Sequence, residues 1–153
     1  KVRSRLYWYL ADKEAAQVDP AASSLVLDLQ GNIAECHGAN FLIVQDGTIL
    51  SPTTRNMLEG VTWKTTLELA EKLGIPTVLR DITPHEAYNA DEAFTTSSGI
   101  CTMPVTKMDN IQIGDGKPGP IVKRLLEAWS EIAGYDIVER CRQAHDRAQA
   151  RTA

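Results

Sequence analysis

The sequence is poor in the features that mark several classes of protein. Its three cysteines are an odd number without a C-x-x-C pair, which favours a reducing compartment over a disulfide framework. No apolar run approaches the roughly 20 residues of a membrane span, and no signal-peptide pattern opens the chain. The net charge of −4 gives no electrostatic reason to expect nucleic acid or an anionic membrane as a partner. We therefore expect a cytoplasmic protein.

What is present is typical of an ordinary globular domain. Hydrophobic residues make up 43% of the 153 residues and charged residues 24%, enough for one domain or one domain with a helical tail. The chain starts with Lys1 rather than methionine. We interpret this as a processed chain or as part of a longer polypeptide.

Helical and alternating patterns follow one another along the chain and predict an α/β (α+β) fold. The predicted helices cover residues 3–17, 61–73, a short segment 83–90 capped by Thr83, and a last helix that starts at Pro118 or Gly119. In that last helix, a buried stripe is expected at Ile121, Leu125, Trp129 and Ile132. Strands are predicted at residues 24–29, 33–35, 40–45, 48–50, 75–82, 92–98 and 102–109. We expect a curved, mixed or largely antiparallel sheet surrounded by helices.

The segment IAECHGANF, residues 33–41, offers an acid, a thiol, an imidazole and an amide. Cys36 and His37 are adjacent, so on a strand their side chains point to opposite faces and cannot act as a nucleophile with its base. His85 and His145 show no ligand spacing, and we expect no metal site. Cys36 is interpreted as a small buried apolar residue.

Residues 114–119 spell G-x-G-x-x-G, a pattern that also occurs in dinucleotide-binding folds. That site needs a following parallel strand with an acid near its end. The residues after Gly119 are helical, so we interpret the pattern as a glycine-rich turn before a helix.

Two stretches could each bind an anion. Residues 95–99 are small hydroxyl residues followed by a glycine, and they could present hydroxyl and N–H groups to it. Gly60, Val61 and Thr62 stand at the start of a predicted helix, where free N–H groups suit a phosphate. Alone, each signal is weak.

Taken together, five segments resemble the large C-terminal domain of the fold-type IV pyridoxal phosphate (PLP) enzymes, the class IV aminotransferases. The segments are KVRSRLYWYLADKEA, LDLQGNIAECHGANFLIVQDGTILSP, LEGVTWKT, ADEAFTTSSGICTMPV and GPIVKRLLEAW. The family includes branched-chain and D-amino-acid aminotransferases, with aminodeoxychorismate lyase as a relative. The resemblance implies a curved pseudo-barrel sheet with helices around it, and pyridoxal 5′-phosphate as cofactor.

The family motif places its Schiff-base lysine 34 positions before a glutamate, and Lys1 stands 34 positions before Glu35. The resemblance therefore implies that Lys1 is the catalytic lysine and that Glu35 pairs with the pyridine nitrogen. An amine is needed to hold the cofactor aldehyde. A carboxylate on the ring nitrogen keeps that nitrogen protonated, so the ring can accept electrons.

The same matching implies further cofactor-binding residues. Asn40 fixes the local backbone or approaches the cofactor, and Leu58 packs on the ring face. Val61 and Thr62 bind the phosphate through the helix N-terminus. Ser97-Ser98 completes the cradle for the phosphate and the substrate carboxylate.

The resemblance implies transamination between a branched-chain-like or D-amino-acid-like substrate and a 2-oxo acid, in a homodimer. Residues 1–138 would be the PLP-binding domain and residues 139–153 a polar helical tail, with the family's small N-terminal domain absent. Some members have a tyrosine where this chain has Leu6. Two alternatives remain open: a PLP lyase of the aminodeoxychorismate type, since residues 4–6 are close to its N-R-L, and a non-catalytic domain or fragment.

Overall fold

The computed structural model describes residues 4–152, so Lys1 lies outside the described residues. The helices are α1 (Leu6–Val18), α2 (Val61–Lys72), α3 (Pro84–Tyr88), α4 (Pro120–Ala133) and α5 (Ile137–Thr152). The strands are β1 (Leu25–Leu27), β2 (Ile33–Cys36), β3 (Asn40–Gln45), β4 (Thr48–Ser51), β5 (Thr77–Leu79), β6 (Glu92–Ser97), β7 (Cys101–Val105), β8 (Lys107–Met108) and β9 (Ile111–Gln112). The helices and strands confirm the predicted α/β class.

The central sheet is mixed and has the strand order β5-β4-β3-β6-β7. Strands β4 and β5 pair in parallel, and the other neighbours pair antiparallel. Strands β1 and β2 form a separate antiparallel hairpin, as predicted. Strands β8 and β9 form a second hairpin, which was not predicted. Within residues 4–152 the strands do not close into a barrel.

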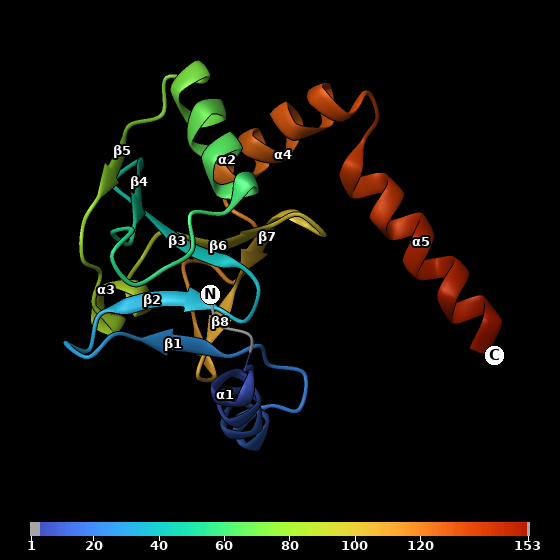
Figure 1. The fold of residues 1–153 in the computed structure, drawn as a ribbon. Coiled ribbons are helices and arrows are strands. Elements are labelled where there is room, and N and C mark those ends of the chain that lie inside the picture. Colours follow the sequence, from blue (N-terminus) through green and yellow to red (C-terminus); the bar gives the residue numbers. More distant parts are fainter. Residues whose placement is uncertain (1–3, 153) are drawn as a thin grey trace.

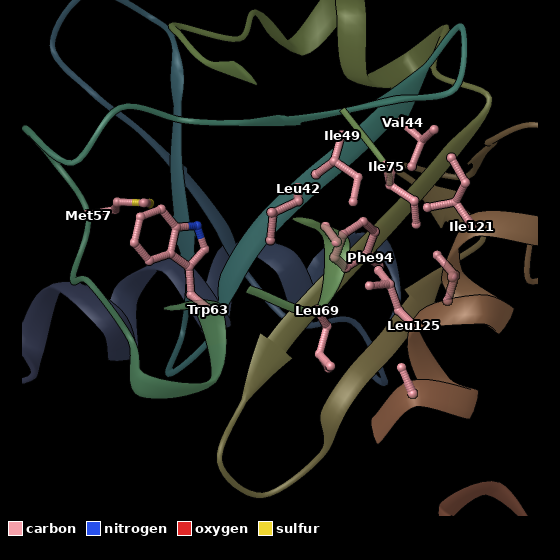
Figure 2. Packing of buried hydrophobic residues seen from close by; sticks show 13 residues of the cluster. Leu42, Val44, Ile49, Met57, Trp63, Leu69, Ile75, Phe94, Ile121 and Leu125 are labelled. Carbon is pink, nitrogen blue, oxygen red and sulfur yellow. The ribbon is translucent and has the colours of Figure 1, made fainter. Parts of the chain in front are cut away.

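Strand β3 is apolar along most of its length because both of its faces are covered. Leu42 and Val44 face a cluster that includes residues of α2 and α4, whereas Phe41 and Ile43 face a second cluster with β2 and α3. The first cluster is drawn in Figure 2, where Phe94 of β6 lies among residues from β3, β4 and α4. Each fully buried side chain of this size contributes about 1.5–3 kcal/mol to the stability of the fold.

Helices α2 and α4 cover one side of the sheet, and the β1–β2 hairpin, α3 and α1 lie on the other (Figure 1). In α1, the buried side chain is Trp8, whereas Leu6 and Leu10 are exposed. Helix α5 extends away from the sheet (Figure 1). Among the described residues, no helix is long and apolar enough to cross a membrane.

Three predicted details are wrong. The expected strand 102–109 is two strands, β7 and β8, because Asp109 and Asn110 have positive φ angles of 49° and 63° and turn the chain into β9; such a pair is typical of a tight hairpin turn. Strand β5 is shorter than residues 75–82, since it pairs only through residues 77–79. Ile132, expected in the buried stripe, is 58% exposed because it lies in the last turn of α4, beyond the buried residues 121–128.

Candidate functional site

Glu35 lies on β2 and is half-buried. Its Oε2 accepts a hydrogen bond of 2.9 Å from the backbone N–H of Leu58, in the loop before α2. Within residues 4–152, the second oxygen, Oε1, accepts no hydrogen bond. The carboxylate is therefore fixed in orientation by one oxygen and has acceptor capacity left on the other.

Asn40 binds the same loop through the carbonyl oxygen of Leu58. Its buried side-chain amide donates to the carbonyl oxygen of Leu58 at 2.7 Å and approaches the sulfur of Met57 at 3.5 Å. Leu58 is thus fixed at both its N–H and its carbonyl, while its side chain is 48% exposed and free to cover a flat ligand. Of the two roles expected for Asn40, its contacts support fixing the backbone.

Gly60 permits this close arrangement. A Cβ atom built at position 60 would lie 2.5 Å from the Oδ1 atom of Asn40, closer than real Cβ contacts allow. Its φ of −65° is accessible to any residue, so the requirement for glycine comes from the space beside Asn40 and not from the backbone conformation.

Helix α2 begins directly after this loop and its N-terminus is open. Gly60 is the N-cap and provides no side-chain cap. In the described part of the chain, no group accepts a hydrogen bond from the N–H groups of Val61, Thr62 or Trp63. Free N–H groups and the helix dipole together make such a terminus an anion-binding site.

Hydroxyl groups from β6 and β7 lie beside α2. The Thr62 hydroxyl donates to the Ser98 hydroxyl at 3.4 Å, which joins the first turn of α2 to the turn after β6. Thr96 and Thr102 are cross-strand partners, and their buried hydroxyls have no hydrogen-bond partner among the described residues. Alternation along β6 places Thr96 on the same face as Phe94, which packs in the cluster that contains residues of α2. Unpaired buried hydroxyls of this kind are costly without a further polar partner.

The expected site residues are brought together only in part. Glu35, Asn40 and Leu58 form one connected group, and Thr62 and Ser98 form a second at the start of α2. Ser97 points to the opposite face of β6, where it lines a cavity of about 980 Å³ between α1, the β1–β2 hairpin and β7. The position of Lys1 relative to Glu35 stays a prediction.

Cys36 is not suited to act as a nucleophile in this segment. Cys36 is buried, and burial, followed by the charge of Glu35, raises the pKa of its thiol to about 12. The thiol is therefore protonated and unsuited to nucleophilic attack, as expected of a buried apolar residue. Among the described residues, no group of three or more acidic, histidine or cysteine side chains could hold a metal ion.

The sequence included Thr96 only as one of the hydroxyl residues in 95–99, and it gave neither the burial of that hydroxyl nor the reason for Gly60. The unpaired hydroxyl of Thr96 depends on burial, which no local pattern reports. The contact between Gly60 and Asn40 joins positions 20 residues apart. The N-F dipeptide at residues 40–41 and the glycine before α2 are visible in the sequence, but their contact is not.

Together, the mixed sheet, the carboxylate on β2 and the open helix start define an α/β protein with a candidate site for an anionic ligand. The sequence pattern of the family "Amino-transferase class IV" matches residues 1–108. The chain belongs to the class IV aminotransferase family.

Curated relatives agree with this assignment. The chain is similar to the branched-chain-amino-acid aminotransferase of Pseudomonas aeruginosa PAO1, with 36% identity over 82% of this chain and 39% of the relative. It is also similar to the D-alanine aminotransferase of Listeria monocytogenes serotype 4b, with 35% identity over 86% of this chain and 44% of the relative. The chain thus spans less than half the length of these relatives.

Solved structures show the same fold. The branched-chain amino acid aminotransferase of Thermobaculum terrenum, solved in its PLP-bound form, superposes with a TM-score of 0.77 at 31% identity, over 82% of this chain and 41% of that chain. The Escherichia coli branched-chain amino acid aminotransferase gives a TM-score of 0.77 at 32% identity, over 81% of this chain and 42% of that chain.

Proposed function

We propose that this chain carries the PLP-binding part of an aminotransferase, which moves an amino group from an amino acid to a 2-oxo acid. The relatives are named for branched-chain amino acids and for D-alanine, so we propose an amino donor of one of these two classes. Residues 1–138 are assigned to the cofactor-binding domain and residues 139–153 to a polar helical tail.

The observation that carries the proposal is the short loop between the two groups of site residues. Leu58, bound to Glu35, and Thr62, bound to Ser98, are four residues apart. Four residues span at most about 14 Å, so a carboxylate and an open helix N-terminus lie within reach of one small ligand. A pyridine ring with a phosphate group has the complementary pair of features: a ring nitrogen at one end and an anion at the other.

Each of the site residues has a role in binding such a ligand. The N–H groups at the start of α2, with Thr62 and Ser98, bind the phosphate. The free Oε1 of Glu35 accepts a hydrogen bond from the protonated ring nitrogen, and the side chain of Leu58 covers one face of the ring. When bound, PLP supplies an electron-accepting ring to the substrate Cα.

Lys1 has two roles in the proposal. Its amine holds the cofactor aldehyde before the substrate arrives, and afterwards it carries a proton to and from the substrate Cα. Asn40 acts through the backbone of Leu58 and keeps the loop in position. Ser97 is proposed to contribute through its backbone, because its side chain lines the cavity on the opposite face of β6.

The test is chemical trapping. The full-length protein is incubated with PLP and reduced with borohydride, which converts a lysine-bound cofactor into a stable secondary amine, and the modified peptide is mapped. We expect one cofactor on the side chain of Lys1 and none in Lys1→Ala. A chain that remains unmodified, or that is modified equally at exposed lysines such as Lys13, would overturn the proposal.

An activity assay separates the transferase from the lyase alternative. L-Leucine and D-alanine are offered in turn, each with and without 2-oxoglutarate. A transferase needs the 2-oxo acid as acceptor for sustained turnover, whereas a lyase of the aminodeoxychorismate type releases its product without an acceptor. We propose that turnover depends on the acceptor and that one of the two amino acids is strongly preferred.

The homodimer and the cytoplasmic location belong to the same proposal. Light scattering on the full-length protein tests the dimer, with twice the monomer mass as the expected result. Fractionation of the source cells tests the compartment.

A further inference from the structure

Three separate segments meet in one polar and aromatic cluster near Glu35. Helix α1 contributes Trp8 and Asp12, with Arg5 at its N-cap. The loop before β1 contributes Ser24, and the turn after β2 contributes His37, two residues after Glu35. We call these five residues the α1 clamp.

The hydrogen bonds of the α1 clamp run in a chain through His37. Asp12 Oδ2 lies 2.6 Å from His37 Nδ1, and the Ser24 hydroxyl donates to Asp12 Oδ1 at 2.6 Å. The guanidinium of Arg5 contacts His37 Nε2. Trp8 stacks on the imidazole, with ring centroids 5.1 Å apart and the planes at 10°.

The partners of His37 fix the roles of its two ring nitrogens. A guanidinium can only donate hydrogen bonds, so Nε2 of His37 accepts from Arg5. Nδ1 is then the ring nitrogen that donates to Asp12. The hydrogen bond from the Ser24 hydroxyl, and then His37, lower the pKa of Asp12, so the carboxylate is ionised and a strong acceptor.

The α1 clamp attaches the first helix to the segments that flank the β1–β2 hairpin. Trp8 is the buried side chain of α1. Arg5, Trp8 and Asp12 are spaced three and four residues apart, so they share one face of the helix. At the other end of α1, Asp19 pairs with Lys107 of β8 at 3.2 Å, an exposed contact of little energetic weight.

We propose that His37 is a positioning residue, which holds the start of α1 against the strand of Glu35, and that the reaction of Lys1 with the cofactor aldehyde depends on this attachment. The inference rests on the proposed function. Arg5 follows Lys1 by four residues in the chain and is itself bound to His37. Loss of the clamp is therefore expected to slow the reaction of Lys1 with the cofactor. The proposed phosphate site, Thr62 and Ser98 at the start of α2, shares no residue with the clamp and is expected to keep its affinity.

The test compares two measurements in His37→Phe, which keeps a ring to stack on Trp8 and removes both ring nitrogens. The first is the rate at which PLP becomes trapped on Lys1 by borohydride. The second is the affinity for 4′-deoxypyridoxine 5′-phosphate, which lacks the aldehyde and cannot react with lysine. We expect the trapping rate to fall at least tenfold, because small misplacements of a reacting group are costly, and the analogue affinity to change less than twofold.

Two further variants serve as controls. His37→Asn keeps a side-chain N–H for Asp12 and is expected to recover most of the trapping rate. His145→Phe makes the same chemical change on the exposed helix α5 and is expected to behave as wild type in both measurements.

The outcomes are distinguishable. No trapping on Lys1 in the wild-type protein would overturn the proposed function and the inference with it. Trapping in wild type that is equally fast in His37→Phe would overturn the inference alone. An equal loss of trapping and of analogue affinity would also overturn it, because that pattern indicates general destabilisation.

Discussion

Helices α2 and α4 begin in the same way and are completed differently. Each has an extended glycine as N-cap, Gly60 and Gly119, without a capping side chain of its own. At α4 the buried carboxylate of Glu92 accepts from the N–H groups of Ile121 and Val122, at 2.9 Å each. In the described part of the chain, α2 receives no such partner.

The difference shows which helix start the chain stabilises by itself. A carboxylate at a helix N-terminus is favoured by the free N–H groups and by the helix dipole. Glu92 supplies it to α4 from a neighbouring strand, so that end is closed to ligands. Helix α3 is closed by its own sequence, through the capping box of Thr83 and Glu86. Helix α2 is left open beside the residues proposed to bind the cofactor.

The largest effect is expected from removing the carboxylate that closes α4. Glu92→Ala leaves two buried N–H groups without an acceptor and should lower the free energy of unfolding by about 3 kcal/mol. Urea denaturation measures it. Glu92→Gln keeps one acceptor oxygen, and its free energy of unfolding should fall by about half as much as that of Glu92→Ala. Equal stability of Glu92→Ala and wild type would show that α4 does not need this cap.

The paired substitutions Gly119→Ala and Gly60→Ala test the two glycines with one chemical change. A Cβ at position 119 would lie 2.1 Å from the Glu92 side chain, and one at position 60 would lie 2.5 Å from Asn40. Both should lower the free energy of unfolding by about 2 kcal/mol through overpacking. Only Gly60→Ala should also weaken PLP binding, about tenfold in a fluorescence titration. Equal weakening of PLP binding in both variants would contradict the proposal that PLP binds at the start of α2 and not at the start of α4.

A charge beside the open terminus should have a smaller effect. Val61 is 77% exposed, so Val61→Glu adds a negative charge at the start of α2 without a steric conflict. It should weaken PLP binding by about fivefold, equivalent to ~1 kcal/mol, and added salt should reduce the loss. Val61→Gln is the matched neutral variant and should bind as wild type does. An equal loss in both variants would point to shape instead of charge.

The smallest effect concerns the locally capped helix α3. Arg80, and then the backbone N–H of Thr83, lower the pKa of Glu86 from its usual 4.5 to about 2. Because the pKa is lower in the folded state, the stabilisation is present above about pH 4.5 and is lost as the pH falls toward 2.

Urea midpoints measured between those pH values provide the check. As the pH falls, the wild-type protein should lose stability more steeply than Glu86→Gln, because the variant lacks the carboxyl group that becomes protonated. Asp12, Asp19 and Asp28 are present in both proteins and contribute equally to both curves. Parallel curves for the two proteins would contradict the lowered pKa of Glu86 in the folded state.

Much of the fold was predictable because its signals are local. Alternation and turn residues located β1 to β4, and Thr83 with Pro84 marked the start of α3. Helix α4 was recognisable from its apolar stripe, apart from its exposed end at Ile132. The hairpin of β8 and β9 was missed although Asp109-Asn110 is a turn signal, because the apolar run before it was interpreted as one strand.

The site was predictable in its parts and not in its connections. The resemblance pointed to Glu35, Asn40, Leu58 and Thr62 through one motif and one helix start. The contacts between them join positions 18 to 36 residues apart, and no periodicity reports such pairs. The burial of Thr96, the closed start of α4 and the α1 clamp depend on tertiary packing in the same way.

The most direct test of the comparison is a two-dimensional amide NMR titration of the protein with PLP. The amide signals of Val61, Thr62 and Trp63 should move on addition of the cofactor, whereas those of Ile121 and Val122 should stay in place. Unchanged signals at the start of α2, or equal changes at α4, would contradict the claim that the start of α2 is open for the phosphate of the cofactor.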